Sequence, residues 1–127
     1  MTTTQERDLT TPRRLLERIV SCVDGQGWRS RTEPSKHSEL ERVVFFPSEN
    51  QLPEEIFLFE LMPPVGASGC WTGDLTLLTN LETLMFSVDG GEWFAHVQKP
   101  NSLQDEAIRE PLSEELLLEQ IERMRAV

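Results

Sequence analysis

Two short runs of apolar residues constrain the fold of this chain more than any other feature of its sequence. The runs are VVFF (Val43 to Phe46) and EIFLFELM (Glu55 to Met62), and each is followed at once by a proline, Pro47 and Pro63. Residues that are β-branched or aromatic favour strands, and the proline that follows ends the strand. Because apolar residues occupy consecutive positions, we expect both faces of these strands to need cover.

An amphipathic helix is predicted near the beginning of the chain. Thr11 and Pro12 are typical of a helix start, and Gly25 and Gly27 of a helix end. The apolar residues between them recur at helical spacing: Leu15, Leu16, Ile19, Val20 and Val23. We therefore expect a helix from about residue 11 to the glycines.

A second amphipathic helix is predicted at the end of the chain. Ser113 can cap its first turn, and acidic residues follow where the positive end of the helix dipole favours them. Its apolar stripe consists of Leu117, Ile121 and Met124, widened by Leu116 and Leu118. A helix of roughly 14 residues is marginal alone, so we expect this stripe to pack on the core.

The segment DLTLLTNLETLM, residues 74–85, has two interpretations. A helix capped by Asp74 would place one set of residues on its apolar face: Leu77, Leu78, Leu81, Leu84 and Met85. A strand would instead use the alternation of Leu75 and Leu77 with threonines, turning at Thr79 and Asn80. We favour the helix.

The remaining elements are a hairpin and polar connections. In MFSVDGGEWFAHVQKP, residues 85–100, Asp89 to Gly91 supply the turn, and on the second strand Trp93, Ala95 and Val97 share one side. Residues 26–42 are read as a loop with a short strand near Trp28 to Thr32, and residues 101–111 as a polar connection. The predicted fold class is therefore α+β, a small antiparallel sheet with helices in the order α-β-β-(β)-α-β-β-α. Residues 1–10 are expected to be flexible and residues 11–127 to form a single domain.

Composition narrows the classes of partner. The chain has 127 residues, with 22 acidic residues against 12 basic ones and a net charge of −10, which repels phosphate backbones and makes nucleic acid an unexpected ligand. The start has no apolar leader region, and no apolar run approaches the ~18 residues of a membrane span, so we expect a cytoplasmic protein that does not bind membranes. Cys22 and Cys70 belong to no disulfide or metal pattern and are expected to be reduced and buried.

No residue pattern predicts catalysis. Cys70 with His96 is the only pairing of a nucleophile with a base that can be named, and no spacing supports it. The two histidines and two cysteines show no metal-ligand spacing, and Trp71 is more typical of a core residue than of a ligand platform. We therefore predict no catalytic residue, no metal and no cofactor, and a protein that is not an enzyme.

The chain as a whole resembles the class I type III secretion chaperones, small acidic cytosolic dimers of Gram-negative pathogens. The resemblance covers about Thr11 to Met124 and lies in size, acidity and element order. It also includes LTLLTN (residues 75–80), where the family has a leucine-rich central helix, and the terminal EELLLEQIERM. It implies a homodimer that binds the N-terminal segment of a secreted effector protein in extended form and keeps it soluble for export, without nucleotide.

The partner site is expected along the first helix and the two strands beside it. The apolar arc of the helix is broader than one sheet contact needs, and the outer faces of the strands lack an obvious cover. The predicted partner-binding residues are Leu15, Leu16, Ile19, Val20, Val23, Phe45 and Phe57. Two other classes stay open: an acidic inhibitor or immunity protein that occludes a basic toxin, and a small-ligand binder or enzyme that uses Trp71, Cys70 and His96.

Overall fold

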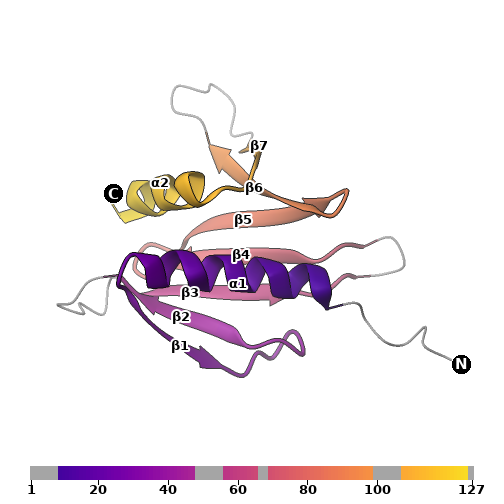
Figure 1. Ribbon diagram of the computed structural model, residues 1–127, viewed down its shortest axis with the longest axis horizontal. Helices are drawn as coiled ribbons and strands as arrows, with labels where there is room; N and C mark the ends of the chain where they lie inside the picture. Colours follow the sequence, from indigo (N-terminus) through magenta and orange to yellow (C-terminus); the bar gives the residue numbers. More distant parts are fainter. Residues whose placement is uncertain (1–8, 48–55, 66–68, 99–106, 126–127) are drawn as a thin grey trace, which may run out of the picture.

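The computed structural model describes residues 9–47, 56–65, 69–98 and 107–125, which form two helices and seven strands (Figure 1). The elements, in chain order, are α1 (Thr10–Gly25), β1 (Arg29–Glu33), β2 (Arg42–Phe46), β3 (Phe57–Met62), β4 (Thr72–Leu77), β5 (Glu82–Asp89), β6 (Glu92–Gln98), β7 (Ala107–Pro111) and α2 (Glu114–Arg125).

The strands form one antiparallel sheet whose spatial order is the chain order, because every strand pairs with the next one along the chain. The turn between β5 and β6 contains Gly90 and Gly91, both at positive φ, as the sequence predicts for this hairpin. Both helices lie on the same face of the sheet, so the molecule has two layers (Figure 1).

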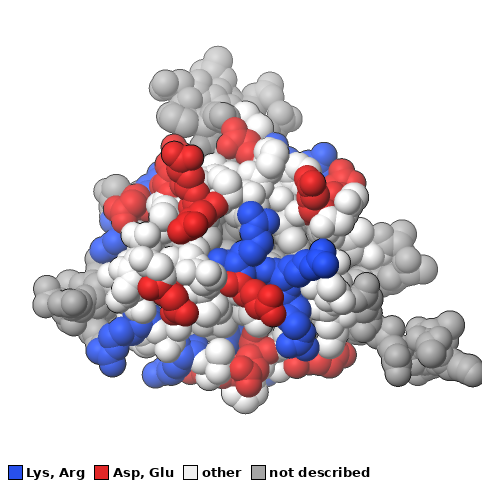
Figure 2. Space-filling model, viewed as in Figure 1, with Lys and Arg blue, Asp and Glu red and all other residues white. Residues whose placement is uncertain are grey.

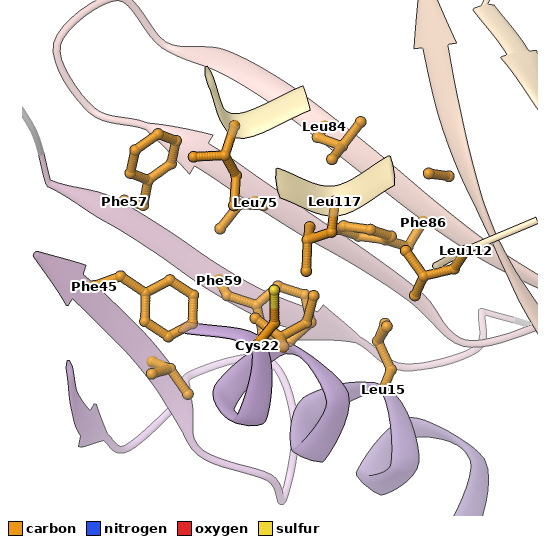
Figure 3. Packing of buried hydrophobic residues seen from close by; sticks show 14 of the residues in the cluster. Leu15, Cys22, Phe45, Phe57, Phe59, Leu75, Leu84, Phe86, Leu112 and Leu117 are labelled. Carbon is orange, nitrogen blue, oxygen red and sulfur yellow. The ribbon is translucent and has the colours of Figure 1, made fainter. Parts of the chain in front are cut away.

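The core fills the space between the helices and the sheet. Alternate strand residues face the helices and are buried: Phe57, Phe59 and Leu61 on β3, and Gly73, Leu75 and Leu77 on β4. Phe59 and Phe86 meet edge to face, with ring centroids 6.0 Å apart. Leu15 from α1 and Leu117 from α2 point into the same cluster (Figure 3). The two helices therefore share one core.

Polar contacts fix both helices at their ends. The indole Nε1 of Trp93 donates a hydrogen bond to the Thr11 carbonyl at 3.0 Å, and the backbone N–H of Leu116 donates to Ser113 Oγ at 3.1 Å. The second contact confirms the predicted cap of α2. By contrast, α1 begins at Thr10 without a side-chain cap, slightly earlier than the sequence predicts.

The prediction of a central helix over residues 74–85 is wrong, because this segment forms the end of β4, a turn and the start of β5. Leu75 and Leu77 are buried on the helix side of the sheet, while Thr76 between them points away. Leu78 and Leu81, which the helical interpretation needs on its apolar face, are exposed in the turn. The two-residue alternation of a strand therefore describes this segment, and the 3.6-residue repeat of a helix does not.

The predicted element order is wrong for the same reason. The described residues form two helices and seven strands, with one helix at each end, not three helices alternating with strand pairs. β1 agrees with the short strand expected near Trp28, whereas β7 occupies a segment that was expected to be only a connection. Predictions for residues 1–8, 48–55, 66–68 and 101–106 lie outside the described residues.

Candidate functional site

The face of the sheet opposite the helices is the strongest candidate for a binding surface. Within the described ranges, both helices pack on the other face and neither covers this one (Figure 1). We call this surface the open face. By strand register it carries Arg29, Arg31, Glu33, Arg42, Val44, Phe46, Leu58, Glu60, Met62, Thr72, Asp74, Thr76, Thr83, Met85, Ser87, Asp89, Glu92, Phe94, His96, Arg109 and Pro111.

Apolar side chains form two groups on the open face. On one side Val44 stands directly opposite Leu58, and Val44 is buried although it does not belong to the core cluster between sheet and helices. On the other side Met85 is 51% exposed. Near it, the guanidinium of Arg109 lies over the ring of Phe94, 4.7 Å from the ring centroid. Leu58 is half-buried and Met85 half-exposed, so each group leaves some apolar surface that a partner could remove from water.

A pair of carboxylates occupies the centre of the open face. Glu60 and Asp74 stand directly opposite each other on β3 and β4. Two like charges at opposite positions repel each other and destabilise the strand pair. Burial of Asp74, and then the charge of Glu60, raise the pKa of the Asp74 carboxyl above its ordinary value. Glu60 also accepts a hydrogen bond from Ser35 Oγ at 3.3 Å and lies 3.9 Å from His37 Nε2. The pair is a concentration of negative charge between the two apolar groups.

The open face as a whole is nearly balanced in charge. Its strands present four arginines (Arg29, Arg31, Arg42 and Arg109) against five carboxylates (Glu33, Glu60, Asp74, Asp89 and Glu92). Several of them pair: Arg42 Nη2 lies 3.0 Å from Glu33, and Arg109 Nη1 lies 3.1 Å from Asp89. The net charge of −10 therefore resides mostly elsewhere on the chain.

The polar groups of the open face do not assemble a catalytic centre. Ser87 Oγ and His96 Nε2 are 2.6 Å apart, but no carboxylate contacts the other ring nitrogen among the described residues. In the same part of the chain no hydrogen bond joins Cys70 to His96, and Cys70 is exposed, contrary to the prediction that it is buried. Trp71 is a buried core residue, as the sequence predicts. Within the described ranges, no three histidine, cysteine or acidic side chains come together as metal ligands.

The structure places most of the predicted partner-binding residues in the core. Leu15, Ile19, Val23, Phe45 and Phe57 are 0% exposed in the isolated chain and face one another between α1 and the sheet. The other two, Leu16 and Val20, are half-buried and pack against the same cluster. The helix and strands are thus in contact where a groove was expected.

The carboxylate pair on the open face was not predicted from the sequence. Glu60 interrupts the apolar run of β3, and Asp74 begins the segment that was read as a helix, so nothing in the order of residues places them opposite each other. The alternation of β3 is the one available signal, because it sets Leu58, Glu60 and Met62 on a different face from the buried phenylalanines.

Comparison with protein-family models, curated proteins and solved structures found no match. Of the helices in the described ranges, none has the length and apolar character that crossing a membrane requires.

Proposed function

We propose that this chain is a cytoplasmic binding protein without catalytic activity, and that the open face holds an apolar segment of a partner protein that carries a basic residue. The observation that carries the proposal is the position of Glu60 and Asp74 between two apolar groups on this face. A lysine or arginine placed between the two carboxylates would relieve their repulsion, while its neighbours cover Leu58 and Met85.

A partner of different sequence fits this face better than a second copy does. In a two-fold dimer the same patch meets itself, and a dimer centred on this patch would bring two carboxylate pairs together. Such an arrangement offers no cation to either pair. The homodimer that the sequence predicts would then use another surface, and light scattering of the purified chain measures its mass.

This binding function could be that of a chaperone or that of an inhibitor, and the two differ in their effect on the partner. The type III secretion chaperone resemblance predicts a client segment held in extended form, but the segment LTLLTN that supports it is a strand and a turn, not a helix. An acidic inhibitor of a basic enzyme or toxin is favoured by the carboxylate pair itself. An inhibitor would abolish the partner's activity, whereas a chaperone would keep the partner soluble.

Copurification from the native cell, followed by titration calorimetry with the purified partner, tests the proposal. Met85→Lys should weaken binding at least tenfold, because it adds a charge to an apolar group and repels the partner's basic residue. Asp74→Asn should weaken it by a smaller factor. Leu78→Lys is the matched control, since Leu78 is also exposed and apolar but lies in the β4–β5 turn. Equal affinity for wild type, Met85→Lys and Asp74→Asn would exclude the open face.

A further inference from the structure

A groove lined by arginines runs along α1, on the opposite side of the sheet from the open face. Between α1 and the start of α2 it has a volume of about 540 Å³, and an adjoining hollow of about 340 Å³ extends toward the β5–β6 turn. Arg14 and Arg18 line both parts. Figure 2 shows basic side chains gathered near the middle of this face, with acidic side chains around them.

The two arginines are held differently. Arg18 Nη2 donates a hydrogen bond to the Leu112 carbonyl at 2.8 Å, which fixes its guanidinium at the wall of the groove and leaves further N–H donors. Arg14 makes no hydrogen bond or ion pair with any residue that the structure describes. The Arg18 guanidinium is therefore held in place, and the Arg14 guanidinium is available to a ligand.

This placement of positive charge is unfavourable for α1 alone. Arg14 and Arg18 are like charges at i and i+4, and Arg13 and Arg14 lie near the positive end of the helix dipole, where the first turn has no acidic residue. The chain has nearly twice as many acidic as basic residues, yet it places three arginines here. Arg14 in particular has no partner among the described residues that would offset this cost, and a local arrangement of this kind is typical of a binding site.

The walls of the groove define the chemistry of its ligand. Leu112, Leu117 and Trp93 are buried side chains that line it and give it an apolar floor. Three carboxylates also line it: Glu17, Glu92 and Glu114. Each carboxylate lines only one of the two parts, whereas Arg14, Arg18 and Leu112 line both. Positive charge and apolar surface therefore coincide where the two parts meet, and the carboxylates on either side limit the ligand to one negative group.

We propose that this groove binds a short peptide segment of a partner protein in which one carboxylate is flanked by apolar side chains. The planar guanidinium fork of Arg14 would bind the carboxylate with two parallel hydrogen bonds, and Arg18 would add a third donor from a fixed position. The apolar neighbours would lie on Leu112 and Leu117. The site shares only two residues with the open face, Glu92 at the start of β6 and Pro111 at the end of β7.

A random heptapeptide library displayed on phage and selected on the immobilised full chain tests this proposal. We expect enrichment of peptides with an aspartate or glutamate next to leucine, isoleucine or phenylalanine. The best peptide is then synthesised with its acid and with the matching amide, and both are titrated by calorimetry. The acidic form should bind at least tenfold more tightly, and Arg14→Gln should remove at least fivefold of that difference.

Lys36→Gln is the control, because Lys36 is an exposed cation of the β1–β2 connection that does not line the groove. Since Arg14 is exposed and forms no hydrogen bond or ion pair with a described residue, its replacement should leave the fold intact, which thermal unfolding checks. No enrichment, a consensus without an acid, equal binding of acid and amide, or binding only to phosphatidylglycerol vesicles would each overturn the proposal. None of these results bears on the open face, which is tested by the separate variants Met85→Lys and Asp74→Asn.

Discussion

Leu15 of α1 packs on the bare backbone of Gly73 in β4. A Cβ atom at Gly73 would lie 3.1 Å from Leu15 Cδ2 and 3.2 Å from the ring of Phe59, and both neighbours are fully buried. The glycine thus sets how closely α1 approaches the sheet. The contact joins residues from three separate elements: Leu15 from α1, Phe59 from β3 and Gly73 from β4.

Gly73→Ala should destabilise the protein by about 1–3 kcal/mol, because neither neighbour can move away without disturbing the core. Urea unfolding followed by tryptophan fluorescence measures the change. Gly25→Ala is the control, since Gly25 ends α1 and a Cβ there would meet nothing closer than 4.0 Å. That substitution should be neutral or stabilising by about 0.4–1 kcal/mol. A Gly73→Ala protein as stable as wild type would show that the helix is not seated this closely.

Local patterns predicted most elements of this fold but not their arrangement. The helix that contains Leu15, the Asp89–Gly91 hairpin and the terminal helix were all predictable, because caps, turns and periodicity are encoded within a few residues. The structure of residues 74–85 was not predictable, because the leucines fit the spacing of a helix and the alternation of a strand equally incompletely. These leucines are at positions 75, 77, 78, 81 and 84. Pairing of this segment with β3 and β5 decides between them, and that choice depends on residues distant in the sequence.

The candidate site was less predictable than the fold. Phe45 and Phe57 were expected to bind a partner because the outer faces of their strands lack an obvious cover in the sequence, yet both side chains lie in the core on the helix side of the seven-stranded sheet. The opposition of Glu60 and Asp74 follows from strand register alone, and register is set by the whole sheet.

Docking of α2 is tested by truncating its central apolar side chain. Leu117 is 2% exposed and faces the core from α2, so Leu117→Ala should cost about 2–5 kcal/mol through lost contacts and a residual cavity. Glu119→Ala, on the exposed side of the same helix, should change stability by no more than about 0.5 kcal/mol. Thermal unfolding of both variants provides the comparison. If both melt together with wild type, α2 does not pack on the core in solution.

The two cysteines should differ sharply in reactivity. Cys70 is exposed, whereas Cys22 is buried, and burial followed by the charge of Glu114 raises the pKa of its thiol. N-ethylmaleimide at neutral pH should therefore modify Cys70 in the folded protein and reach Cys22 only on unfolding. Peptide mass spectrometry over a time course identifies the modified residue. Modification of both thiols at one rate would contradict this arrangement.

The carboxylate pair should make stability depend on pH in a defined direction. Because the pKa of Asp74 is raised in the folded state, the folded chain binds this proton more tightly than the unfolded chain does. The contribution of Asp74 to stability is thus most favourable below its ordinary pKa. It declines as pH rises toward the raised value and stays unfavourable above it. Asp74→Asn should therefore be more stable than wild type at pH 7, and this difference should disappear toward pH ~4.

Glu33, on the same sheet, provides a control because its pKa shifts in the opposite direction to that of Asp74. Partial desolvation acts to raise its pKa, but hydrogen bonds from Arg42 and Arg31 outweigh it and lower the pKa below the ordinary value. Its stabilising contribution is present above the ordinary pKa and is lost as pH falls through the lowered one. Glu33→Gln should therefore be less stable than wild type at pH 7. Urea unfolding of the three proteins between pH 4 and 8 measures both differences. If Asp74→Asn is no more stable than wild type at pH 7, neither burial nor the charge of Glu60 disfavours the ionised Asp74 carboxyl in the folded chain.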